Sequence, residues 1–188
     1  SNGNSNYYYK DFNEYAIRVI NLNTIDIPYA SNADGTMLYG GQNVWAISDE
    51  QLNWLAHDAL NVPENYHVLI LSHVPLTTES GINFDVALGV LTAFKNGGSY
   101  VNSGATVDFE FNIDVNFESA KNLIGIISGH EHRDQATKTG EDINQIILLN
   151  SLARQTHAET PVRTLDSENE DSFNVAEINT DQRTVVIH

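Results

Sequence analysis

The most constraining feature of the sequence is a short apolar run that ends in a glycine and two closely spaced histidines. The run from Ile124 to Ile127 is rich in β-branched residues, and this composition predicts a buried strand. Ser128 and Gly129 interrupt the run, and glycine allows a sharp turn and a close approach to a ligand. His130 and His132 follow, so both imidazoles are expected just beyond one edge of a sheet.

A second apolar run has a similar ending. Tyr66 to Ser72 is the strongest strand pattern in the chain, and His73 and Pro75 come after it. Proline has no backbone donor and therefore ends the hydrogen-bonding ladder. His73 is thus expected where the chain leaves the sheet, as His130 is, whereas His67 inside the strand is interpreted as structural.

Three histidines at two strand ends indicate a metal site. Neutral imidazole binds zinc, iron and similar ions, and three imidazoles leave a fourth position of a catalytic zinc ion open for water. A hydrolytic pair of metals needs more ligands, including a bridging carboxylate, and no residue of the chain is an obvious bridge. The spacing of the residues alone leaves both kinds of site open.

The remaining patterns predict an α/β (α+β) chain with a mixed sheet and flanking helices. Strands are expected at Tyr7 to Phe12, Ala16 to Leu22, Val107 to Val115, Ile143 to Leu149, Phe173 to Ile178 and Arg183 to Ile187. Helices are expected at Ser48 to Leu60 and Asp85 to Lys95, with a helical turn at Phe117 to Lys121. Ser48 and Gln51 form the pattern of a capping box at the first helix.

Two segments are interpreted as loops by composition, Pro28 to Gln42 and Ala153 to Ser172. Arg154 and His157 in the second loop follow a predicted strand and could reach the same sheet edge. Both are interpreted as ordinary loop residues.

Charge and length limit the possible functions. The 188 residues are enough for one domain with a sizeable core. A formal charge of −16 repels nucleic acid and anionic membranes and attracts metal cations. No apolar run approaches the ~20 residues of a membrane span, and no signal peptide is visible. Residues 1–6 are interpreted as a linker or a remnant of cloning, and with no cysteine the compartment stays unassigned.

These motifs resemble those of the calcineurin-like binuclear metallophosphoesterases. Gly129-His130-Glu131-His132 is similar to the family's Gly-His-x-His, and Ser72-His73-Val74-Pro75 is similar to its lone-histidine motif. The first strand pair, the helix before the lone histidine and the terminal hairpin also follow the family's order. The family's upstream motifs, Asp-x-His, Gly-Asp and Gly-Asn-His, do not occur, so residues 7–188 look like the C-terminal portion of such a domain.

The resemblance implies half of a four-layer α/β/β/α sandwich and a phosphoesterase site. His73 and His130 would bind one metal ion and His132 a second, both divalent or trivalent ions of the Mn, Fe or Zn type. A metal-bridged hydroxide would hydrolyse a phosphomonoester or phosphodiester. The bridging aspartate, the asparagine ligand and the leaving-group histidine would belong to the missing N-terminal half. The chain alone is therefore expected to hold metal weakly, with little turnover.

The resemblance also implies a partner, because a lone half would expose the apolar face that meets the other half. A homodimer, or a complex with the missing N-terminal half, is expected. The alternative is a non-catalytic structural or binding module derived from the same fold. Upstream motifs in frame would favour the enzyme, and their absence would favour the module.

Overall fold

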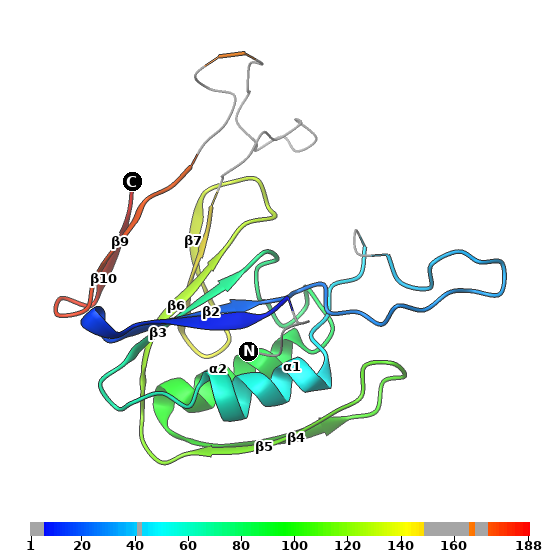
Figure 1. Cartoon of the computed structure of the whole chain (residues 1–188), viewed down its shortest axis with the longest axis horizontal. Coiled ribbons are helices and arrows are strands. Elements are labelled where there is room, and N and C mark those ends of the chain that lie inside the picture. Colours follow the sequence, from blue (N-terminus) through cyan, green and yellow to red (C-terminus); the bar gives the residue numbers. More distant parts are fainter. Residues whose placement is uncertain (1–5, 41–42, 149–165, 168–172) are drawn as a thin grey trace.

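The centre of the molecule is a six-stranded mixed sheet. The computed structural model describes residues 6–40, 43–148, 166–167 and 173–188. The strand order is β1-β2-β3-β6-β8-β7 (Figure 1). The strands are β1 (Tyr8–Phe12), β2 (Ile17–Leu22), β3 (His67–Ser72), β6 (Asn122–Ser128), β7 (Gln135–Thr139) and β8 (Ile143–Ile147). The four central strands run parallel, and β1 and β7 are antiparallel edges. The prediction of a mixed α/β chain with a mixed sheet is confirmed.

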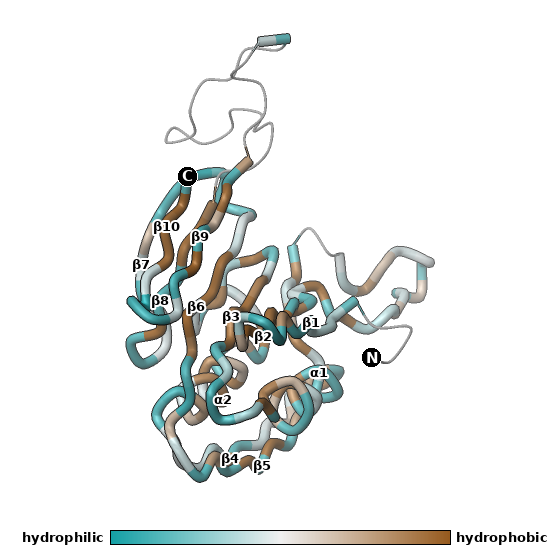
Figure 2. The backbone as a smooth tube through the Cα atoms, turned by 60° about the vertical axis from the view of Figure 1, so that its left-hand side comes forward, coloured by the Kyte–Doolittle hydropathy of each residue, from teal (hydrophilic) through white to brown (hydrophobic). Residues whose placement is uncertain are grey.

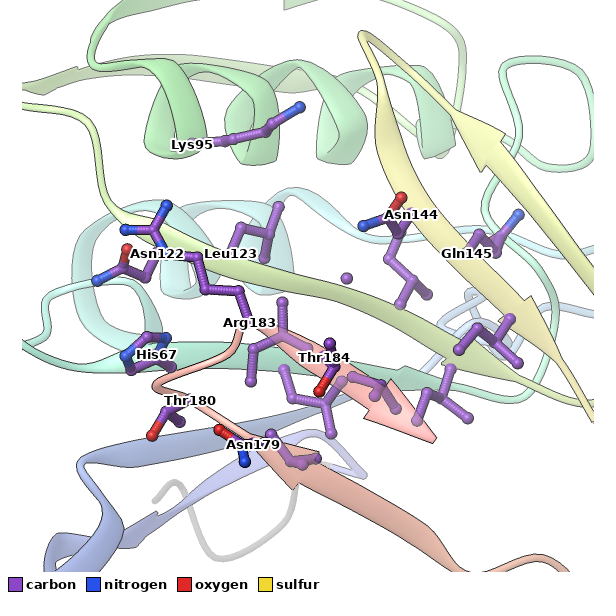
Figure 3. A pocket seen from close by; sticks show the side chains of 18 of the residues that line it. His67, Lys95, Asn122, Leu123, Asn144, Gln145, Asn179, Thr180, Arg183 and Thr184 are labelled. Carbon is purple, nitrogen blue, oxygen red and sulfur yellow. The ribbon is translucent and has the colours of Figure 1, made fainter. Parts of the chain in front are cut away.

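A terminal hairpin lies across one face of this sheet. It consists of β9 (Ala176–Asn179) and β10 (Thr184–Ile187), which pair with each other, and Figure 2 shows it beside β6, β7 and β8. Side chains of the hairpin and of β3, β6 and β8 line a common groove (Figure 3). The predicted terminal hairpin is therefore confirmed.

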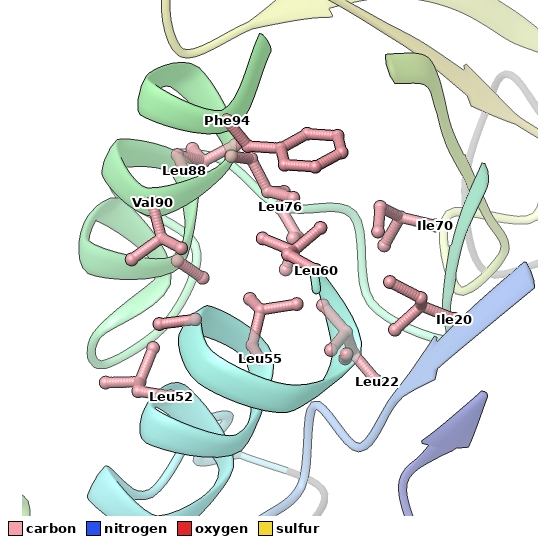
Figure 4. Close-up of a cluster of buried hydrophobic side chains, with 14 of the residues drawn as sticks. Ile20, Leu22, Leu52, Leu55, Leu60, Ile70, Leu76, Leu88, Val90 and Phe94 are labelled. Atoms are coloured by element: carbon pink, nitrogen blue, oxygen red, sulfur yellow. The ribbon is translucent and has the colours of Figure 1, made fainter. Parts of the chain in front are cut away.

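Two helical segments cover the opposite face. The first is α1 (Asp49–Trp54), which continues into the π-helical turn η2 (Leu55–Ala59); the second is α2 (Phe84–Asn96). Figure 4 shows their aliphatic and aromatic side chains meeting Ile20 of β2 and Ile70 of β3. The expected helices are confirmed, except that the second half of the first one has π-helical hydrogen bonding.

The capping box at α1 forms only in part. The Ser48 hydroxyl accepts a hydrogen bond from the Gln51 backbone N–H at 3.2 Å, as expected for an N-cap. The Gln51 side chain does not return to the Ser48 backbone. Its oxygen accepts from the Asn23 N–H at 2.8 Å and its nitrogen donates to Asp26 at 2.9 Å. Gln51 is fully buried, so it fastens the helix to the loop after β2.

A second, two-stranded sheet packs against the helices on the side away from the main sheet (Figure 1). It pairs β4 (Gly98–Gly104), which the sequence did not indicate, with β5 (Phe111–Phe117). The predicted strand from Val107 begins too early, because Asp108 has a positive φ of 68° and Val107 is 73% exposed. The helical turn expected at Phe117 to Lys121 is wrong, since no helix is assigned there.

The Pro28–Gln42 segment is a loop in its described part, residues 28–40, and η1 (Asn13–Tyr15) forms the turn between β1 and β2. Most of the predicted loop from Ala153 to Ser172, including Arg154 and His157, lies outside the described residues. No helix in the described ranges is long and apolar enough to cross a membrane.

Candidate metal centre

The candidate site lies at the carboxyl ends of β3 and β6. These strands are parallel neighbours, and their pairing continues to Ser72 opposite Ser128. Immediately beyond it, the Gly129 N–H donates to the His73 carbonyl at 3.0 Å. A backbone hydrogen bond thus holds the ends of β3 and β6 together at the point where each strand leaves the sheet.

His73 and His130 meet at this edge, although 57 positions separate them. Nδ1 of His130 lies 3.3 Å from Nε2 of His73, and the ring centroids are 5.1 Å apart with an angle of 81° between the planes. A tetrahedral ion bonded to two imidazoles at about 2.0–2.1 Å holds their nitrogens about 3.3–3.4 Å apart. The observed separation fits a hydrogen bond between the two rings, and it also fits two ligands of one ion.

A tight turn presents the histidines. The Glu131 N–H donates to the Gly129 carbonyl at 2.8 Å. His130 and His132 have left-handed backbones, with φ of 70° and 53°. Left-handed non-glycine residues cost free energy and gather at functional sites. The backbone therefore adopts an unfavourable conformation at the two histidines that the sequence predicts to bind metal.

His132 does not join the pair. In the part of the chain that the structure describes, it makes no ring contact or hydrogen bond with His73 or His130. Among the described residues, no group of three histidine, aspartate, glutamate or cysteine side chains converges there in a way that could hold a metal ion. The structure thus brings together two of the three predicted ligands.

Trp45 borders the site, and no pattern in the sequence indicates this position. Its ring meets the His130 ring edge-on, with centroids 4.7 Å apart. The tryptophan is held there by backbone pairing, since its carbonyl accepts from Ile82 at 2.9 Å and the next residue, Ala46, donates to Thr24 at 3.1 Å. These long-range contacts cannot be inferred from local sequence patterns.

The surroundings favour neutral imidazole at His130. Partial burial lowers its pKa, and the neighbouring His73 lowers it further, while Glu131 acts in the opposite direction. Metal ions bind the deprotonated nitrogen, so this shift favours ligation. Beneath the site, the buried Ser128 hydroxyl has no hydrogen-bond partner among the described residues.

Comparison with known proteins assigns no family to the chain. No protein-family model matches it, and no curated protein matches it significantly.

Proposed function

We propose that the chain is the C-terminal part of a metal-dependent phosphoesterase of the calcineurin-like type, which hydrolyses phosphomonoesters or phosphodiesters. The observation that carries the proposal is the 3.3 Å separation between ring nitrogens of His73 and His130 at adjacent strand ends. The placement of the helices on one face and of the hairpin β9–β10 on the other agrees with half of a four-layer sandwich.

In this proposal His73 binds one metal ion through Nε2 and His130 binds the same ion through Nδ1. His132, two residues after His130, is assigned to a second ion by the resemblance alone. Such ions lower the pKa of a bound water and neutralise phosphate oxygens. The short turn Gly129–Glu131 and the edge contact from Trp45 orient the His130 ring toward His73.

The remaining ligands come from outside the described residues. No third ligand converges on the pair in the described ranges, and a two-metal hydrolytic site needs a bridging carboxylate. We assign these ligands to the missing N-terminal half. The chain alone is expected to bind Mn, Fe or Zn ions weakly and to hydrolyse a generic aryl phosphate slowly or not at all. Robust metal-dependent hydrolysis by the chain alone would contradict this division of ligands.

A second candidate is a non-catalytic binding module of the same fold. It is favoured by the incomplete ligand set, together with the ligand-sized groove under β9–β10. Metal binding at the histidine pair separates the two candidates, because the module does not need it.

Cobalt titration tests the proposal, with Trp45 as an internal reporter. The chain has two tryptophans, and Trp54 packs against Tyr7 instead, at 4.7 Å between ring centroids. In a Trp54→Phe background the remaining tryptophan fluorescence comes from Trp45. Bound Co²⁺ should quench it saturably, with one ion per chain.

Adding His73→Ala or His130→Ala should abolish the saturable quenching. The matched control is His57→Ala, because His57 is exposed on η2 and should leave the titration unchanged. Quenching of unchanged size and affinity in the His73→Ala and His130→Ala backgrounds would overturn the proposal.

A further inference from the structure

A groove separates the hairpin β9–β10 from the main sheet. It has a volume of about 760 Å³ and is lined from both sides, by β3, β6, β7 and β8 below and by the hairpin above. Small-molecule sites in proteins commonly measure about 300–1,000 Å³. The groove therefore has the size of a ligand site, and neither His73 nor His130 lines it.

The charge of the groove is opposite to that of the chain. The whole sequence has 25 acidic and nine basic residues. The described residues that line the groove nevertheless include no aspartate or glutamate, whereas Lys95, Lys121 and Arg183 line it. A basic lining in such an acidic chain creates a local field that attracts anions.

Two of these cations are not engaged by acidic groups. Lys95 already donates to the carbonyl of Asp142 at 2.7 Å and pairs with its carboxylate at 3.7 Å. Lys121 and Arg183 have no ion pair with another described residue. They are therefore available to an anionic ligand.

Several polar groups meet at one end of the groove, while Asn144, Gln145 and Lys95 line other parts of it (Figure 3). Figure 3 shows Arg183, Asn122 and His67 together there, with Thr180 and Asn179 of the hairpin close by. Amide and hydroxyl groups beside a guanidinium suit a carboxylate or sulfonate head group, which accepts several hydrogen bonds. This end of the groove has the composition of an anion site.

Apolar side chains from both walls line much of the groove. Leu69, Ile127 and Ile146 contribute from the sheet, and Ile178 and Val185 contribute from the hairpin. Burying the hydrocarbon of a ligand between these two surfaces contributes about 25 cal/mol per Å² of apolar area. The lining thus matches a molecule that is charged at one end and apolar along its body.

We propose that the groove between β9–β10 and the sheet binds a small amphiphilic anion, with its head group at Arg183 and Lys121 and its hydrocarbon along Ile127, Ile146 and Ile178. Medium-chain carboxylates belong to this class. The site goes beyond the proposed phosphoesterase function and needs no metal. In the proposed phosphoesterase the other half would cover this face, so the groove is a ligand site of the chain without that half.

The test is displacement of the fluorescent anion 1-anilinonaphthalene-8-sulfonate from the metal-free chain by dodecanoate, with dodecanol as the neutral analogue. Dodecanoate should bind with one site per chain and at least tenfold more tightly than dodecanol. Arg183→Ala should weaken dodecanoate at least tenfold and leave dodecanol unchanged. Lys121→Ala should also weaken the binding of dodecanoate and leave dodecanol unchanged. Because Lys121 lies outside the hairpin turn, this variant tests the proposal even if Arg183→Ala disturbs the fold of the hairpin.

Lys10→Ala is the matched control, because this residue lies on β1, outside the groove, and should not change binding. Equal affinity for dodecanol and dodecanoate, or no effect of Arg183→Ala and Lys121→Ala on binding, would overturn the proposal. Either result would mean that the groove binds apolar molecules without selecting for an anion. A concentration-dependent dimer that excludes the dye would also overturn it, in favour of a second copy as the occupant. None of these results depends on metal binding at His73.

Discussion

Arg18 of β2 connects three parts of the fold through one buried guanidinium. Its Nε and Nη2 donate to the carboxylate of Asp11 on β1 at 2.6 and 2.8 Å. Its Nη1 donates to the carbonyls of Ala59 and Asn61 at 3.0 and 3.2 Å, at the end of η2. The guanidinium carbon also lies 3.8 Å from the centroid of the Tyr9 ring.

Removing this side chain should destabilise the whole chain. Arg18 is only 6% exposed, so Arg18→Ala leaves buried carbonyls without donors. The expected loss is about 2–4 kcal/mol in the free energy of unfolding, measured by urea denaturation. Lys10→Ala, exposed on the same sheet edge, should change it by less than about 0.5 kcal/mol. Equal midpoints for the two variants would contradict the assigned role of Arg18.

His67 should make stability depend on pH. Burial lowers its pKa from the ordinary value of 6.5, and Arg183 lowers it further, while Asp181 opposes the shift. The folded chain therefore binds this proton less readily than the unfolded chain. The contribution of neutral His67 is complete above pH 6.5 and is lost as the pH falls from 6.5 toward the lower folded-state pKa.

The variant His67→Gln removes this titration. Its urea midpoint should fall less steeply than that of the native chain as the pH decreases from about 6.5 to 5. Parallel curves for the two proteins would show that His67 has the same proton affinity in the folded and unfolded chains.

At the scale of elements, a bulge in β6 sets the position of the candidate site. The pairing of β6 with β3 changes register at Leu69, which lies opposite Gly125 and leaves Ile124 as the extra residue. Gly125 has a positive φ of 149°, and a Cβ at this position would lie 2.6 Å from the Asn144 carbonyl oxygen of β8. Only glycine allows β6 and β8 to approach this closely.

Gly125→Ala should therefore separate β6 from β8 and lower the free energy of unfolding by at least about 2 kcal/mol. Thermal unfolding measures the loss, and faster amide exchange in β8 locates it. Gly40→Ala is the matched control, because nothing lies within 4 Å of a Cβ there and its φ is not positive. Native-like exchange in β8 of the Gly125 variant would contradict the account of the bulge.

The sequence predicts the elements that carry a clear pattern of apolar residues. β3 and β6 are apolar runs, and the two helices have apolar stripes, so local patterns reveal them. β7 is polar and β4 begins at the second of two glycines, and backbone pairing with β8 and β5, respectively, holds the two strands in place. Such pairing joins residues that are distant in the sequence, and the hydrophobic periodicity of a segment does not predict it.

The same division applies to the candidate site. The sequence predicts that His73 and His130 lie close together, because each follows an apolar strand and parallel strands end at one edge. The contact of Trp45 with His130 depends on pairing among distant loops, so it was not foreseen. The approach of Lys121 and Arg183 to one groove likewise requires the hairpin to fold back over the sheet.

At the scale of the whole molecule, the sheet has helices on one face and a two-stranded hairpin over the other. The face under the hairpin carries the basic groove, and one edge carries the histidine pair, so the two proposed sites share the same sheet. The charge of −16 favours cations at the histidine edge, whereas the lining of the groove favours anions. The two sites should therefore bind their ligands independently.

The central claim is that His73 and His130 share one metal ion, and X-ray absorption spectroscopy of the zinc-loaded chain tests it most directly. The account predicts a zinc shell with at least two imidazole nitrogens at about 2.0–2.1 Å, and loss of imidazole scattering in His73→Ala and in His130→Ala. A shell of oxygen alone, or imidazole scattering that both substitutions leave unchanged, would contradict it.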